Sequence, residues 1–193
     1  MRKLAEFLVR ILERKTKIPA ADREVYVYGL DTTLYTFFST AGLILIGYLL
    51  SRGVETLIII AFFYTNQRLG GGFHASTHLT CFLTMALGLL GCIASFALPF
   101  HLFVCCAFGA VSLVLMIKYP LVLHENKQHL QCKESEFRRH SRLALLGQAL
   151  CLLCIALWGK PEYIQAISAA LTVCTLSRMV AIFSFSPPAA RLK

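Results

Sequence analysis

Long apolar runs, separated by short polar or charged stretches, dominate the pattern of this chain. A helix needs about 20 mainly apolar residues to cross a bilayer, and most of these runs approach that length. The pattern therefore predicts six membrane-spanning helices, of which the second is noticeably short. The predicted spans are residues 28–50, 54–66, 81–98, 102–123, 143–158 and 163–185.

The first 22 residues follow a different pattern, with apolar residues at helical spacing and charges on the other face. This predicts an amphipathic, basic helix that lies on the membrane surface and ends at Pro19. Charges run through the whole segment, which excludes a secretory signal peptide. The apolar residues of this predicted helix are Leu4, Phe7, Leu8, Ile11 and Leu12.

Composition supports the same architecture. Of the 193 residues, 57% are hydrophobic and 15% are charged, whereas soluble domains average about 45–50% and about 25%. We expect an all-α, polytopic membrane protein of about six transmembrane helices preceded by the amphipathic helix. Residues 1–193 are predicted to form one integral membrane domain, with residues 1–22 as the surface helix and 28–185 as the bundle.

The net charge of +9 lies mainly at the N-terminus and in the predicted loop 124–142, between apolar spans. This distribution indicates contact with anionic membrane lipid and excludes nucleic acid as a partner. With a cytoplasmic N-terminus, most of the 19 Lys and Arg residues fall inside, whereas Arg52 and Lys160 fall outside. The positive-inside rule therefore predicts six spans with both termini in the cytoplasm. Residues 67–81 then lie at the cytoplasmic side.

The stretch Gly70-Gly71-Gly72 interrupts this apolar pattern after the second span. Glycines are costly inside a helix but are suited to sharp bends and to exposed backbone N–H groups. A bend at membrane depth must line protein or a wet pocket. The glycines therefore predict either a bend beside a polar pocket or a flexible interfacial loop.

Three polar side chains follow the glycines. His74, His78 and Cys81 are spaced by four and three residues, so they share one face of a continuous helix. A histidine beside a thiol suits covalent acyl transfer, in which a thiolate attacks a peptide carbonyl without metal or cofactor. The same residues also form a three-ligand metal set, although no carboxylate nearby would orient the histidines. A purely structural, interfacial cluster is the third interpretation.

The remaining cysteines give no second site. The chain has eight, most of them in apolar segments, and none has zinc-ribbon spacing. The pair Cys151 and Cys154 lies inside a predicted span without a partner pair, which indicates packing. We expect reduced thiols.

Spacing limits the choice of base. In a straight helix, His74 and Cys81 lie about 10 Å apart along the axis, which is too far for a hydrogen bond. Either His74 lies on a non-helical segment that folds back, or His78 is the base. The glycines just upstream allow the first arrangement.

The pattern of Arg68, Gly71, Gly72 and His74, with Cys81 seven residues after the histidine, resembles the signature of the AgrB family. These accessory gene regulator B proteins are bacterial membrane cysteine endopeptidases of about this length and about six spans. The resemblance implies Cys81 as nucleophile and His74 as base, with Arg68, Gly71, Gly72 and His78 in support.

The family cleaves a short AgrD-like propeptide through an acyl-enzyme, and a thiol or hydroxyl of the peptide then displaces the enzyme. The product is a thiolactone or lactone quorum-sensing signal. The resemblance thus implies an AgrD-like propeptide as partner, location in the bacterial cell membrane and a homodimer. The alternative from the residues is a non-enzymatic peptide transporter or membrane scaffold, because transporter sites also use Gly-broken segments between spans.

Overall fold

The computed structural model describes residues 2–15, 19, 22–70, 77–98, 101–119 and 134–185. In these ranges the chain forms seven α-helices and one short 3-10 helix, and no strand occurs among them. The all-α class predicted from the apolar runs is confirmed for this part of the chain. The helices are α1 (Arg2–Lys15), α2 (Arg23–Leu49), α3 (Gly53–Gly70), α4 (His78–Ala94), η2 (Ser95–Ala97), α5 (Leu102–Lys118), α6 (Glu134–Trp158) and α7 (Pro161–Phe185).

The chain divides into two compact units, Met1–Ile46 and Gly47–Lys193. In the first unit, α1 packs on α2 through small apolar side chains. Ala5 and Val9 of α1 are fully buried with Val27 of α2. An ion pair at 3.0 Å between Arg23 Nε and Glu13 Oε1 joins the same two helices at the polar edge. A helix thus forms where the N-terminal pattern placed one, and its membrane-surface role stays a prediction.

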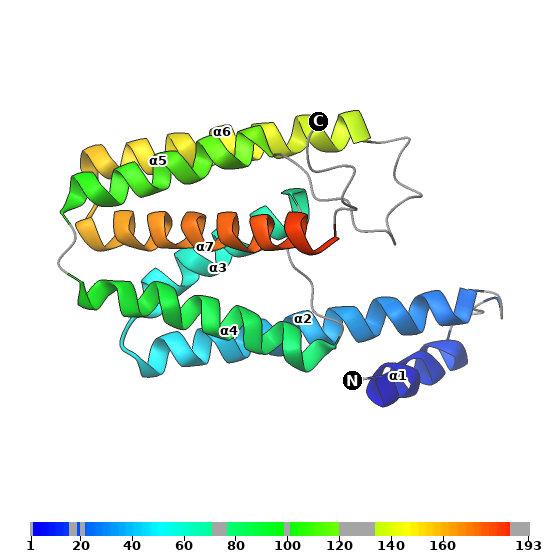
Figure 1. Ribbon diagram of the computed structural model, residues 1–193. Helices are drawn as coiled ribbons and strands as arrows, with labels where there is room; N and C mark the ends of the chain where they lie inside the picture. Colours follow the sequence, from blue (N-terminus) through cyan, green and yellow to red (C-terminus); the bar gives the residue numbers. More distant parts are fainter. Residues whose placement is uncertain are drawn as a thin grey trace. The chain divides into compact units, whose positions relative to one another are not determined.

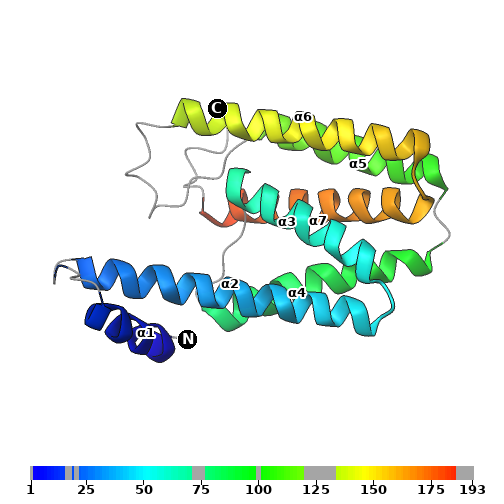
Figure 2. The same cartoon turned by 180° about the vertical axis from the view of Figure 1, so that it is seen from behind.

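Helix α7 is the central element of the second unit. It packs against α3, α4, α5 and α6, and both views show it between these neighbours (Figures 1 and 2). Ile164, Ala166, Ile167, Ala170 and Leu171 of α7 are almost completely buried. The small alanines allow close approach of neighbouring helices, as is typical of packing in membranes. The bundle is therefore built around α7.

The outward faces of the bundle are strongly apolar. Phe103 and Trp158, for example, are each 83% exposed, a state that favours lipid over water as the surroundings. Among the residues that the structure describes, four helices are long and apolar enough to cross a membrane, namely α2, α4 with η2, α6 and α7, and α5 is a shorter apolar helix. A membrane protein is thus indicated, while the count of six spans stays a prediction.

Three helices extend beyond the predicted spans by four residues or more at one end. Helix α2 begins at Arg23 rather than residue 28, α3 continues to Gly70, and α6 begins at Glu134 rather than residue 143. The predicted loop 124–142 is therefore helical in its last part. The added segment of α6 is rich in Glu and Arg, which favour helix, and has no Gly or Pro. Apolarity marks only the membrane part of a helix, so its polar extension was missed.

The turn predicted at residues 51–53 is confirmed. Ser51 has a φ of 57°, in the left-handed region, and the N–H of Arg52 donates to the carbonyl oxygen of Gly47 at 2.9 Å. The Arg52 side chain pairs with Glu55 at 3.2 Å and lies 4.8 Å from the Phe96 ring centroid. This cation–π contact joins the α2–α3 turn to η2.

Candidate active site

A complete N-terminal cap begins helix α4. Thr77 has extended backbone angles, φ −123° and ψ 153°, and its hydroxyl accepts a hydrogen bond from the backbone N–H of Thr80. The Thr80 side chain accepts in return from the N–H of Thr77 at 3.3 Å. This reciprocal pair is a capping box, with threonine at the position usually held by Glu or Gln. The cap fixes the first helical residue as His78.

Cys81 lies in the first turn of α4. Its backbone N–H donates to the carbonyl oxygen of Thr77 at 3.0 Å, and its residue is partly buried. His78 lies three residues earlier on the same helix and is exposed. Residues three apart on a helix are neighbours on one face. His78 and Cys81 therefore share one face of α4, at the positive end of its dipole, whereas His74, the third residue of the predicted face, lies outside the described residues.

Arg68 lies in the last turn of α3 and is exposed. The helix ends at Gly70, the first of the three glycines. Gly71, Gly72 and His74 lie outside the described residues. The end of α3 and the start of α4 both lie at the end of the second unit that carries the C-terminal ends of α5 and α7 (Figure 1). Arg68 and Cys81 therefore lie on either side of the segment 71–76, at the same end of the bundle.

The sequence comparison bears directly on this arrangement. The model of the AgrB family, accessory gene regulator B, matches residues 1–183. The chain belongs to the AgrB family. Searches among curated proteins and among solved structures found no match. Membership of the AgrB family associates the chain with propeptide processing in agr quorum sensing.

One feature of this AgrB-family site follows from Thr77. Its extended backbone lies directly before the helix of Cys81, whereas the predicted fold-back of His74 concerns residues outside those that the structure describes. Thr77 and Thr84 both lie close to Cys81 in the sequence. Both hydroxyls take part in local hydrogen bonds, Thr77 in the cap and Thr84 as a donor to the Thr80 carbonyl oxygen at 2.8 Å.

Sequence reasoning missed a buried amide pair near the end of α3. Asn66 and Gln148 of α6 are 4% and 7% exposed. The Asn66 Nδ2 donates to Gln148 Oε1 at 3.2 Å and to the Phe62 carbonyl oxygen at 2.9 Å. In the sequence, both amides are polar residues within apolar runs. Such polar residues mark functional or packing sites in membranes. Nothing in the sequence, however, pairs positions 82 residues apart.

A buried cation was also missed. Arg178 of α7 is 1% exposed. Its Nη1 donates to the carbonyl oxygens of Met116 and Tyr119, at 3.4 and 3.2 Å. These carbonyls belong to the C-terminal end of α5, which lacks helical donors and favours positive charge. Arg178 therefore caps α5 from the neighbouring helix.

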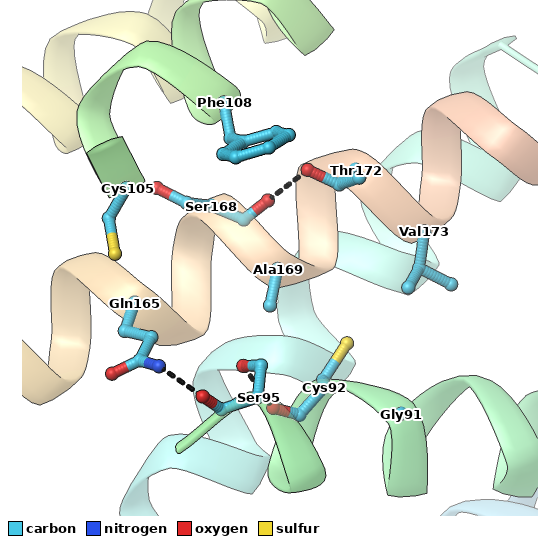
Figure 3. A pocket seen from close by; sticks show the side chains of 10 residues that line it. All are labelled: Gly91, Cys92, Ser95, Cys105, Phe108, Gln165, Ser168, Ala169, Thr172 and Val173. Carbon is cyan, nitrogen blue, oxygen red and sulfur yellow. Dashed lines mark hydrogen bonds between the residues drawn. The ribbon is translucent and has the colours of Figure 1, made fainter. Parts of the chain in front are cut away.

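A cavity of about 240 Å³ lies between α4, α5 and α7, but it is remote from Cys81. Cys92, Ser95, Cys105 and Gln165 are among its lining residues (Figure 3). The Gln165 Nε2 donates to the Ser95 carbonyl oxygen at 2.6 Å at its edge. On α4, Cys92 is eleven residues beyond Cys81, about 16 Å along the axis. This cavity is therefore separate from the candidate active site.

Proposed function

We propose that this AgrB-family protein is a membrane cysteine endopeptidase that cleaves an AgrD-like propeptide and helps to cyclise it. The observation that carries the proposal is the place of Cys81 in the first turn of α4, directly after the segment that holds the family's arginine, glycines and histidine. The proposed nucleophile is Cys81 and the proposed base is His74. Arg68, Gly71, Gly72 and His78 support them.

The first step forms an acyl-enzyme. His74 takes the Cys81 proton, and the sulfur attacks the carbonyl carbon of the scissile peptide bond. The resulting oxyanion is stabilised by backbone N–H groups of the glycine segment and of the α4 N-terminus, such as that of Leu79. When the C–N bond breaks, the amine leaves with the proton that His74 held. A thioester between Cys81 and the N-terminal part of the propeptide remains.

The second step closes the ring. A thiol or hydroxyl of the bound peptide attacks the thioester carbonyl, and Cys81 leaves as the thiolate and recovers a proton through His74. When the attacking group is a thiol, one thioester replaces another, so the exchange is nearly balanced in free energy. Water must be excluded during this interval, because hydrolysis would give a linear acid. A site at the membrane boundary limits the access of water.

The proposed topology has six spans, both termini in the cytoplasm and the active site near the cytoplasmic face. It is supported by the excess of Lys and Arg at the ends of the chain and in residues 124–142. It requires α3 and α5 to cross the membrane together with the four longer apolar helices. In this orientation α1 contacts the inner membrane surface through its cations and its exposed apolar residues, such as Phe7, 56% exposed.

The test uses the purified full-length protein in lipid vesicles with an AgrD-like propeptide. Mass spectrometry should detect the released C-terminal fragment and an N-terminal product that is lighter by one water than the linear acid. Accumulation of intact propeptide inside the vesicles, without any fragment, would instead establish the transporter. If the linear acid is the only N-terminal product, the proposed peptidase activity stands and the proposed cyclising step is wrong.

A further inference from the structure

The end of α3 that carries Arg68 is held by two contacts to different helices. Its Asn66 binds Gln148 of α6 through the 3.2 Å amide hydrogen bond. One turn earlier, the ring of Phe63 packs against Gly88 of α4, where an added Cβ would lie 3.6 Å from the ring. The first contact orients α3 against α6 and the second orients it against the helix of Cys81. Together they set the position of Arg68 relative to the nucleophile.

The amide contact is specific because both partners are buried among apolar side chains. The two hydrogens of the Asn66 Nδ2 serve two acceptors, the Phe62 carbonyl oxygen and Gln148 Oε1. A rotation of α3 about its axis would remove the second acceptor from a buried donor, which is unfavourable where water is scarce. The apolar contacts of α3, by contrast, tolerate small rotations with little loss. The amide pair therefore fixes the rotation of α3.

The location of the pair connects it to the site. Asn66 precedes Arg68 by two residues and Gly70 by four, so less than two helical turns separate it from the start of the glycine segment. A rotation of α3 at Asn66 therefore also moves Arg68, which lies on the same helix. Displacement of a reacting group by about 1 Å can lower a rate by about 100-fold.

From this geometry we infer that Gln148, through Asn66, is a positioning residue of the active site. The inference rests on the proposed function, because it assigns the pair to the acyl transfer at Cys81. Neither residue touches the reacting atoms in this role. Gln148 lies on α6, far along the chain from the Arg68–Cys81 segment, and it acts by fixing the end of α3.

The experiment compares Gln148→Leu with the exchanged pair Asn66→Gln/Gln148→Asn, which keeps both amides and the total side-chain length. Steady-state cleavage is measured on the monodisperse, folded fraction of the full-length protein in lipid. Gln148→Leu should lower kcat by about 10-fold to 100-fold, in the range that a misplaced group produces, with KM nearly unchanged. The exchanged pair should recover most of the loss.

Ser112→Ala is the matched control. It removes another interhelical side-chain contact, the 3.3 Å pair of Ser112 on α5 with Thr172 on α7, which does not involve α3. Its kcat should stay close to that of the parent protein. An equal loss in Ser112→Ala and Gln148→Leu, or failure of the exchanged pair to recover activity, would show a general packing effect and overturn the inference.

A double-mutant cycle with Arg68→Ala tests the route of action. If Gln148 acts through the end of α3, Gln148→Leu should lower kcat by a much smaller factor in the Arg68→Ala background than in the parent protein. Additive losses would overturn the inference. Hydrogen exchange of residues 66–70 gives a readout that does not depend on catalysis, and Gln148→Leu should accelerate it. Faster exchange with an unchanged kcat would overturn the inference and leave the proposed function intact. Cleavage by Cys81→Ala would overturn the proposed function.

Discussion

The N–H of Cys81 donates to the carbonyl oxygen of Thr77, at 3.0 Å, and so closes the first turn of α4. Thr77 is also the residue whose hydroxyl caps that helix. The proposed nucleophile is therefore held by the same residue that separates its helix from the segment of His74. This relationship makes the cap part of the site, because a frayed first turn would release Cys81.

Thr77→Ala should destabilise the start of α4. Loss of an N-cap hydroxyl costs about 1 kcal/mol, and the freed first turn should also lower the cleavage rate. Thermal unfolding and propeptide cleavage of the same purified sample measure both effects. Thr84→Ala is the control, since its hydroxyl adds only a second donor to the helical carbonyl of Thr80. Equal effects of the two substitutions would show that the cap has no special role.

The two histidines should differ in their effect on cleavage. His74→Ala should abolish propeptide cleavage, because the proposed base is removed. His78→Ala should lower it less, because His78 is exposed in the first turn of α4 and only supports the site. Time courses of fragment release compare the two variants. A larger loss in His78→Ala would make His78 the base, and equal losses would leave no reason to prefer His74.

Gly47→Ala should disturb the close contact between Gly47 in the last turn of α2 and Thr56 in the first turn of α3. A Cβ at residue 47 would overlap the side chain of Thr56, which is fully buried. Overpacking of this kind costs about 1–3 kcal/mol, and thermal unfolding in detergent should detect it. Thr56→Ala in the same chain should relieve only part of the overlap, because the Cβ of residue 56 would still lie 2.5 Å from the added Cβ. Gly147→Ala, whose added Cβ meets nothing within 4 Å, should be neutral or stabilising.

Arg178→Met should destabilise the bundle. The substitution removes the donor to the carbonyl oxygens of Met116 and Tyr119, and a buried polar group left without its partner costs about 1–3 kcal/mol. Arg178→Lys keeps the charge near the C-terminal end of α5 and should lose less. Arg139→Met, at an exposed position of α6, is the control for loss of positive charge. If its melting temperature falls as far as that of Arg178→Met, the capping role is wrong.

Much of the fold could be predicted from the sequence, because membrane helices are marked by long apolar runs. The helical class, the turn at residues 51–53 and the approximate places of the helices are confirmed. The polar ends of α2, α3 and α6 were missed, since apolarity marks the part of a helix in the bilayer and not its extension. The sequence feature that indicates the start of α6 at Glu134 is a run of helix-forming residues without Gly or Pro.

The site was predictable only where its residues are close in sequence. The shared face of His78 and Cys81 follows from their spacing alone, and Thr77 before the run was a readable capping signal. The contacts of Asn66 with Gln148, and of Arg178 with the end of α5, join residues about 60–80 positions apart. Such pairs depend on how the helices pack, and no local pattern encodes that arrangement.

Detection of the acyl-enzyme tests the central claim most directly. The full-length protein, incubated with an AgrD-like propeptide and quenched in acid, should gain the mass of the N-terminal part of the propeptide minus one water. Peptide mapping should place the adduct on Cys81, and hydroxylamine should cleave the thioester, which releases the peptide as its hydroxamic acid and restores the free thiol. Cys81→Ala should fold and insert normally, yet form neither adduct nor cleaved fragment. Normal cleavage by Cys81→Ala, or an adduct on another cysteine, would contradict the account.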